Sequence, residues 1–260
     1  MATARSPVIL VYRRAARGFA SLREMLARND FHAVVPPDAL AEWECVDDRG
    51  TRVRSWAGTL LVEAEDDHRA DEFDRAHRAG MPSDGDVPDG GDPPRRVRVI
   101  AGSDEAGKGE RDRPLAVAAV AVPVDAEREA LARGVRDSKL CTAGEIAELA
   151  RWIRGKFVHV ERVVEAGARA EALREHGGNE TRLLAAMHAE CVGEVARREE
   201  AVLLARVDRF APNRPVGRAC PDLIVDECVR GERHVACAAA SVLARATSIG
   251  ARHVPPSAPH

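Results

Sequence analysis

Two adjacent carboxylates, Asp104 and Glu105, lie where an apolar run breaks into glycines, and no other stretch of the sequence concentrates as much chemistry. The run from Val97 to Ala101 alternates as a strand does, and the following glycines indicate a tight loop. Neighbouring carboxylates repel each other unless a proton or a cation lies between them, and their oxygens suit hard divalent ions, Mg²⁺ or Mn²⁺. The placement suggests a metal site, whereas on residue types alone a solvated acidic turn is the commoner interpretation.

The same span nearly matches a phosphate-binding loop, because Gly102 to Lys108 fits the spacing G-x-x-x-x-G-K. That motif requires Ser or Thr at the next position, where this sequence has Gly109. The two carboxylates would also lie inside the phosphate cradle. A nucleotide-binding α/β protein is therefore the least favoured interpretation.

Three motifs stand out along the chain. The first is Gly102-Ser-Asp-Glu-Ala-Gly-Lys-Gly109, which is followed by Pro114-Leu and an alanine/valine strand. The second is Val207-Asp-Arg-Phe210, and the third is the small-residue run from Gly231 to Arg245, which suits a helix packed tightly on a sheet. Together they resemble the motifs of the type 2 ribonuclease H family, and most closely its ribonuclease HIII branch, whose third acidic motif is similar to the second of these.

The resemblance implies a catalytic, metal-binding set of four carboxylates: Asp104, Glu105, Asp208 and Glu232. Glu232 stands one residue closer to Ser241 than the family pattern, so Asp226 is the alternative fourth carboxylate. Such a cluster suits phosphodiester hydrolysis with two ions, Mg²⁺ or Mn²⁺, about 4 Å apart.

The resemblance also implies the residues that contact the substrate: Gly107, Lys108, Gly109, Ser138, Lys139 and Asn179. The glycine loop lets the backbone approach the minor groove and recognise the ribose 2′-OH, and the lysines hold phosphates. Ser138 and Lys139 belong to a D-S-K loop, and Asn179 opens a helix beside the site. His188 on that helix has the pattern of an ordinary helix residue. The loop after Gly109 carries charges where the family has aromatic and glycine residues.

The implied function is an endoribonuclease that hydrolyses the RNA strand of RNA/DNA hybrids, leaving 5′-phosphate and 3′-hydroxyl ends. A catalytically degenerate hybrid-binding protein of the same fold is one alternative, and a ribonuclease HII-type enzyme that cuts at single ribonucleotides is another. The HII branch uses a tyrosine beside the 2′-OH. The single tyrosine of this chain, Tyr12, lies outside the expected catalytic domain, which favours the HIII branch.

The expected fold is a ribonuclease H-like mixed α/β sheet flanked by helices, preceded by a small α+β domain that resembles the TATA-binding-protein fold. We expect the small, substrate-binding-like domain at 1–78, a Gly/Pro/Asp-rich linker at 79–95 and the catalytic domain at 96–260, with a short Pro-rich tail. In the first domain the pattern predicts strands at 7–12, 43–46, 51–56 and 59–64 and helices at 20–28 and 71–78.

Composition limits the remaining function classes. Hydrophobic residues make up 45%, charged residues 31%, and the net charge of −3 argues against nonspecific nucleic-acid binding, although ions bound to a carboxylate cluster would offset it. The six cysteines form no C-x-x-C pair, so we expect reduced thiols. The apolar run at 8–11 is too short for a signal peptide, and we expect a cytoplasmic protein without membrane contact or an obligatory protein partner.

Overall fold

The computed structural model describes residues 8–13, 26, 31–34, 43–56, 59–79, 94–110 and 112–251. The chain divides into two compact units, Met1–Val97 and Arg98–His260. The predicted linker lies outside the described residues except at its ends. The predicted helix at 20–28 also lies outside them, apart from Leu26. None of the helices described here is both long enough and apolar enough to cross a membrane.

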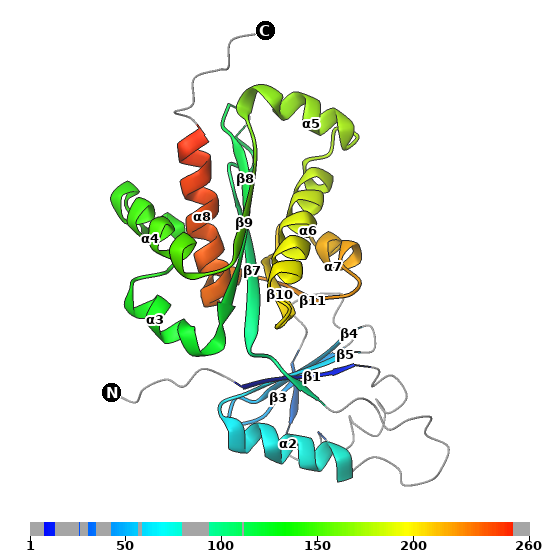
Figure 1. Ribbon diagram of the computed structural model, residues 1–260. Helices are drawn as coiled ribbons and strands as arrows, with labels where there is room; N and C mark the ends of the chain where they lie inside the picture. The colour runs from blue at the N-terminus through cyan, green and yellow to red at the C-terminus, as the bar shows by residue number, and fades with distance from the viewer. Residues whose placement is uncertain are drawn as a thin grey trace. The chain divides into compact units, whose positions relative to one another are not determined.

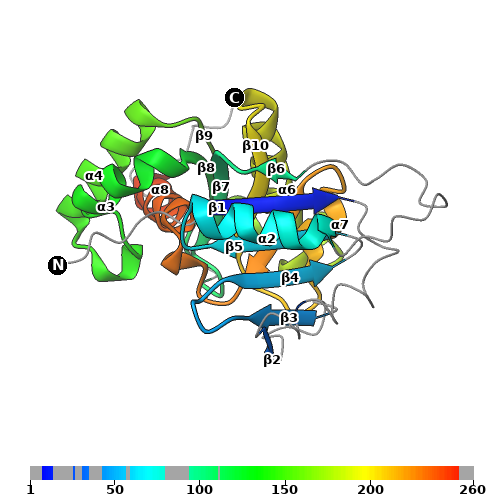
Figure 2. The ribbon, with the colours of Figure 1, turned by 90° about the horizontal axis from the view of Figure 1, so that it is seen from below.

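The N-terminal unit contains a sheet of order β2-β3-β4-β5-β1-β6 in which every pairing is antiparallel. Its strands are β1 (Val8–Arg13), β2 (His32–Val34), β3 (Trp43–Val46), β4 (Arg52–Trp56), β5 (Thr59–Ala64) and β6 (Arg95–Arg96). Helix α2 (Asp67–Ala79) packs on β1 and β5 (Figure 2). The bounds predicted for β3 and β5 are confirmed.

Helix α2 begins four residues before the predicted start at Asp71. The Asp66 side chain accepts a hydrogen bond of 3.0 Å from the backbone N–H of Arg69 and so satisfies one of the free donors of the first turn. Phe73 of α2 and Leu10, Leu60 and Val62 of the sheet are buried together in the core of this unit. The cap at Asp66 and the burial of one helix face therefore determine where α2 begins, which the sequence pattern predicted four residues too far along the chain.

The C-terminal unit contains a mixed sheet of order β11-β10-β7-β8-β9 (Figure 1). Its strands are β7 (Val99–Ala106), β8 (Leu115–Pro123), β9 (His159–Val164), β10 (Val202–Asp208) and β11 (Ile224–Cys228). Strand β10 is parallel to both β7 and β11, whereas β7, β8 and β9 pair antiparallel. Because the carboxyl ends of parallel strands meet at one edge, this order brings the ends of β7, β10 and β11 together.

Helices cover both faces of this sheet. One face carries α3 (Glu127–Ala132), α4 (Ala143–Lys156) and α8 (Val235–Ala251), and the other carries α6 (Glu180–Arg198) and α7 (Pro215–Ala219), with α5 (Arg169–Glu175) leading into α6 (Figure 1). A Cβ on Gly102 of β7 would come within 2.0 Å of the Ala236 carbonyl carbon. Only glycine therefore allows α8 to lie this close to the central strand.

Strand β11 is a buried element that the sequence did not predict. Asp226 and Glu227 interrupt its apolar pattern, yet their exposed fractions are only 1% and 0%. Backbone pairing with β10 and polar partners for both carboxyl groups override the polar composition. The predicted mixed α/β class is confirmed. Strand β11, which lies at the edge of the sheet next to β10, is the strand that the sequence pattern did not indicate.

Candidate active site

Asp104 and Glu105 lie within β7, which continues through Ala106, so the strand does not end at Asp104 as the glycine pattern suggested. Adjacent side chains of a strand point to opposite faces. Accordingly, Asp104 contacts Ser241 of α8 on one face, and Glu105 contacts His188 of α6 on the other. The two carboxylates therefore have different surroundings although they are neighbours in the chain.

Asp104 is 8% exposed and lies among other negative charges. Burial raises its pKa well above the usual value, and the charges of Glu105 and Asp208 raise that pKa further. Hydrogen bonds from the Glu105 N–H and the Ser241 hydroxyl oppose this shift. Because Ser241 donates its hydrogen to Asp104, Ser138 donates to Ser241 across 2.8 Å. Ser138, which was predicted to contact the substrate, is thus buried and contacts Asp104 only through Ser241 among the described hydrogen bonds.

Glu105 is held by a fully buried histidine. The Ser103 hydroxyl donates to the Ala118 carbonyl at 2.8 Å, so its single hydrogen is used, and His188 Nδ1 donates to Ser103 at 2.7 Å. The other ring nitrogen, Nε2, lies 3.2 Å from Glu105 Oε2. Burial raises the pKa of Glu105, but the hydrogen bond from His188 and nearby positive charges outweigh it, and the pKa lies below the usual value.

Sequence reasoning missed the role of His188, which was predicted to be an ordinary helix residue. Its ring stacks on Phe210 with centroids 4.9 Å apart and an interplanar angle of 10°. The Lys108 ammonium lies 5.5 Å from the same Phe210 centroid and donates to the Phe210 carbonyl at 3.1 Å. The only sequence signal was the position of His188 on the buried face of a helix beside the acidic motifs, and a histidine at such a position is more often an ordinary core residue.

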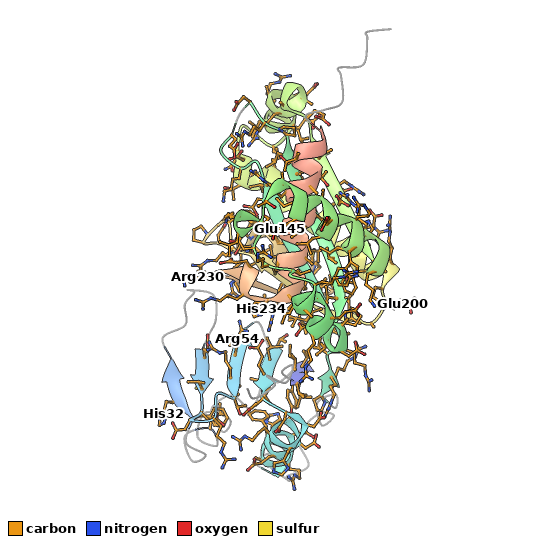
Figure 3. All side chains as sticks on the ribbon, turned by 90° about the vertical axis from the view of Figure 1, so that its left-hand side faces the viewer. His32, Arg54, Glu145, Glu200, Arg230 and His234 are labelled. Carbon is orange, nitrogen blue, oxygen red and sulfur yellow. The ribbon has the colours of Figure 1, made fainter. Side chains whose placement is uncertain are left out.

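Asp208 ends β10 and joins the cluster from the neighbouring strand. Burial raises its pKa, the Gly231 N–H at 2.7 Å lowers it, and the charges of Glu105 and Glu232 raise it. A Cβ on Gly231 would come within 2.8 Å of the Asp208 Cα, so glycine lets the turn before Glu232 lie against the strand. That turn, η4 (Gly231–Arg233), is flanked by Arg230 and His234 (Figure 3).

Asp226, the alternative fourth carboxylate, lies elsewhere. It is 1% exposed, and its Oδ2 is 3.7 Å from Nε of Arg206, which is itself buried. Its negative charge is thus compensated inside the protein, whereas the charge of Glu232 acts on Asp208. These surroundings favour Glu232 over Asp226 as the fourth carboxylate, and the assignment stays a prediction.

The other predicted substrate residues lie on loops and at the start of a helix. Gly107 has φ +90°, and a Cβ there would lie 2.2 Å from the Pro114 carbonyl oxygen, while Gly109 has φ +76°. Lys139 is exposed, and its positive charge lowers the pKa of both Glu105 and Asp208. Asn179 is the N-cap of α6, where its side chain accepts from the Arg182 N–H at 3.2 Å. Its predicted contact with substrate stays a prediction.

The acidic cluster, which we define as Asp104, Glu105, Asp208 and Glu232, supplies only oxygen donors. Within the described ranges no three His, Cys, Asp or Glu side chains are arranged as a ready-made metal site. The mutual repulsion that raises the pKa values of Asp104 and Asp208 is nevertheless the charge imbalance that a hard divalent cation relieves. The donor set therefore fits Mg²⁺ or Mn²⁺ chemically, although its geometry is not closed around an ion.

The family model described as Ribonuclease HII matches residues 101–249, which include all four carboxylates. The chain belongs to the ribonuclease HII family. This confirms the resemblance to type 2 ribonucleases H that the three motifs indicated.

Curated relatives bear the name Ribonuclease HIII. The protein from Chlamydia trachomatis serovar D is 31% identical over 163 residues, which cover 60% of this chain and 54% of that protein. The protein from Chlamydia muridarum is 27% identical over 237 residues, covering 87% of this chain and 75% of the relative. The chain thus spans about half the length of most of the relatives it matches.

Solved structures agree on the fold. Bst-RNase HIII in complex with Mn²⁺ matches with a TM-score of 0.53 and 20% identity, over 93% of this chain and 81% of that chain. Aquifex aeolicus RNase H3 matches with a TM-score of 0.51 and 17% identity, over 93% and 84%. Because these matches extend over most of the chain, the small N-terminal α+β part belongs to the shared fold as well.

Proposed function

We propose that this protein is a divalent-metal-dependent endoribonuclease that cuts the RNA strand of RNA/DNA hybrids. The observation that carries the proposal is the acidic cluster. Its carboxylates come from β7, β10 and η4. Burial and the charges of neighbouring carboxylates raise the pKa of Asp104 and Asp208, and among the described contacts no arginine neutralises these two side chains. The Mn²⁺ complex of Bst-RNase HIII supports a divalent ion as the cofactor.

In this proposal Asp104, Glu105, Asp208 and Glu232 hold two ions. Bound ions supply an activated water and stabilise charge on the leaving oxygen, which yields 5′-phosphate and 3′-hydroxyl ends. The chain itself orients the carboxylates: Ser241 and Ser138 support Asp104, and His188 supports Glu105. Each of these groups restricts a side chain that would otherwise rotate away from its charged neighbours.

Substrate contact is assigned to the rim of the cluster. The Gly107–Gly109 backbone, freed from Cβ atoms, approaches the hybrid minor groove where the 2′-OH groups lie. Lys108 and Lys139 hold phosphates; Lys108 is already tied to Phe210 and lies 3.7 Å from Glu105 Oε1, so it is directed towards the cluster. No protein partner and no membrane contact enter this proposal.

Cleavage of two labelled substrates tests the proposal: an RNA/DNA hybrid and a DNA duplex with one ribonucleotide, each with Mg²⁺ or Mn²⁺. Metal-dependent cleavage of the hybrid alone, lost in Asp104→Asn, is the expected result. Cleavage at the single ribonucleotide assigns the activity to the HII type instead.

A catalytically degenerate hybrid-binding protein is the second candidate. The observation in its favour is that the described carboxylates do not already form a metal-holding group. This candidate predicts that the folded protein binds the hybrid without Mg²⁺ or Mn²⁺ and cuts neither substrate with either ion. That outcome overturns the enzyme proposal.

A further inference from the structure

Arg169, the first residue of α5, is a buried cation that the acidic cluster does not use. Its exposed fraction is 2%, and arginine is rarely buried to this extent without partners. Its Nη1 donates to three backbone carbonyls, those of Gly107 at 2.9 Å, Glu110 at 2.7 Å and Arg113 at 3.0 Å. Its Nη2 forms an ion pair with Glu180. One guanidinium thus joins the loop after β7 to the first residue of α6.

The loop is shaped to present these carbonyls together. The Glu110 N–H donates to the Gly107 carbonyl and the Arg113 N–H donates to the Glu110 carbonyl, each at 3.2 Å. Two turns in succession therefore place a carbonyl at every third residue, and all three carbonyls converge on Nη1 of Arg169. The hydrogens of one nitrogen are shared among three acceptors, which a charged donor supports better than a neutral one.

Hydrophobic burial does not hold this loop. Residues 108–113 are Lys-Gly-Glu-Arg-Asp-Arg, without an apolar side chain, and residues 108 and 109 are exposed. Gly107 and Gly109, which have positive φ angles in the fold, lose more backbone freedom on folding than other residues do. The contacts from Arg169 therefore compensate for the charged residues that replace the aromatic and glycine residues expected from the family.

We propose that Arg169 is a positioning residue for substrate: it fixes the backbone at Gly107, Glu110 and Arg113, together with the start of α6, as one rim that contacts the hybrid. This inference rests on the proposed function and deepens it. Arg169 acts through the Gly107 carbonyl and Glu180, not through the acidic cluster. It therefore sets hybrid affinity and the preference for hybrid over DNA duplex, and leaves metal binding unchanged.

The test uses the full chain with Arg169→Lys, which keeps the charge and removes the planar fork that reaches several acceptors. Arg174→Lys is the matched control, because Arg174 is an exposed residue of the same helix. We expect Arg169→Lys to raise KM for the hybrid about tenfold, with kcat and calorimetric Mn²⁺ affinity unchanged. Amide hydrogen exchange in 107–113 becomes faster, and the control matches the parent.

A lower Tm with unchanged KM and unchanged exchange in the loop means a purely structural role and overturns the inference. A parent that neither binds nor cuts the hybrid overturns the proposed function as well, so the two failures are distinguishable. If Arg169→Lys does not fold, Glu180→Gln provides the test, because it weakens the ion pair and leaves Arg169 in place. It is expected to raise KM to a smaller extent, and an unchanged KM and loop exchange in that variant contradict the inference.

Discussion

The buried carboxylates of the N-terminal unit and those of the acidic cluster in the C-terminal unit have opposite surroundings. In the N-terminal unit Glu44 and Asp47 are 1% and 6% exposed, and each pairs with an arginine, Arg52 and Arg69 respectively. Asp47 also accepts hydrogen bonds from backbone N–H groups, with Thr51 N at 2.7 Å. These acids are neutralised within the fold, and their charge holds loops and strands together.

In the C-terminal unit, by contrast, the carboxylates of the acidic cluster interact with one another's negative charge. Burial and the nearby carboxylates raise the pKa of Asp104 and Asp208, so ionising them costs the folded state free energy. A protein that can place Arg69 beside Asp47 has the means to neutralise Asp104 as well. The difference supports the proposal that the acidic cluster binds a cation, and it teaches that acidic content alone does not distinguish carboxylates paired within the fold from those left unpaired.

The largest effect is expected from Asp104→Asn. Cleavage of the hybrid falls on the order of a thousandfold, because a metal-binding oxygen and its charge are lost. Thermal unfolding at neutral pH shows the opposite sign: since the folded-state pKa of Asp104 is raised, its ionisation lowers stability as pH rises above the unfolded value, and the variant has the higher Tm. A lower Tm in the variant contradicts the comparison.

The next effect concerns His188. In His188→Asn the amide keeps the contact near Ser103 and loses the one to Glu105, and Mn²⁺ affinity falls about 10- to 100-fold by calorimetry. His188→Gln reaches farther and retains more affinity. His176, whose Nδ1 lies 2.8 Å from the Ala172 backbone carbonyl, supplies the control substitution His176→Asn. Equal Mn²⁺ affinity in all variants means that His188 merely fills space.

In the N-terminal unit, Arg69→Gln leaves Asp47 buried without its cation. We expect the free energy of unfolding to fall by about 1–3 kcal/mol, measured by urea denaturation, with kcat unchanged at temperatures where the protein is folded. Arg75→Gln is the control, because that exposed arginine of α2 bonds its own helix backbone at 3.3 Å. A change in kcat caused by Arg69→Gln contradicts the purely structural role assigned to the Asp47–Arg69 pair.

The smallest effect is expected from Glu127→Gln at the start of α3, because Glu127 is only partly buried and solvent screens its charge. Burial raises the pKa of Glu127 from 4.5 to about 7. The folded state retains the proton that the unfolded state releases, so the parent loses stability as pH rises from about 4.5 to 7. Melting curves across this range should show the Tm of the parent falling relative to the variant and then a constant difference. A constant difference from pH 4 onward shows that Glu127 has no raised pKa.

Local pattern determined much of the fold and supplied the candidates for the site. The pattern of short apolar runs predicted the bounds of β3 and β5 correctly, because the signal for a short strand depends only on neighbouring residues of the chain. The carboxylates Asp104, Asp208 and Glu232 were predicted from motifs that resemble those of the family, because such motifs are read from residues close together in the chain, and their role as ligands stays a prediction. Gly107 was likewise assigned to a backbone turn, and its φ of +90° agrees.

Only the tertiary structure decided which partners these residues have. Strand order placed β10 beside β7, so Asp208 acts on Asp104 from a segment about a hundred residues away, and it gave Asp226 an arginine instead. The contact of His188 with Glu105 and the three carbonyls around Arg169 depend on helices that pack from different parts of the chain. Residue types specify what chemistry a side chain offers, but solvation and charge are set by neighbours in space, and these exist only after folding.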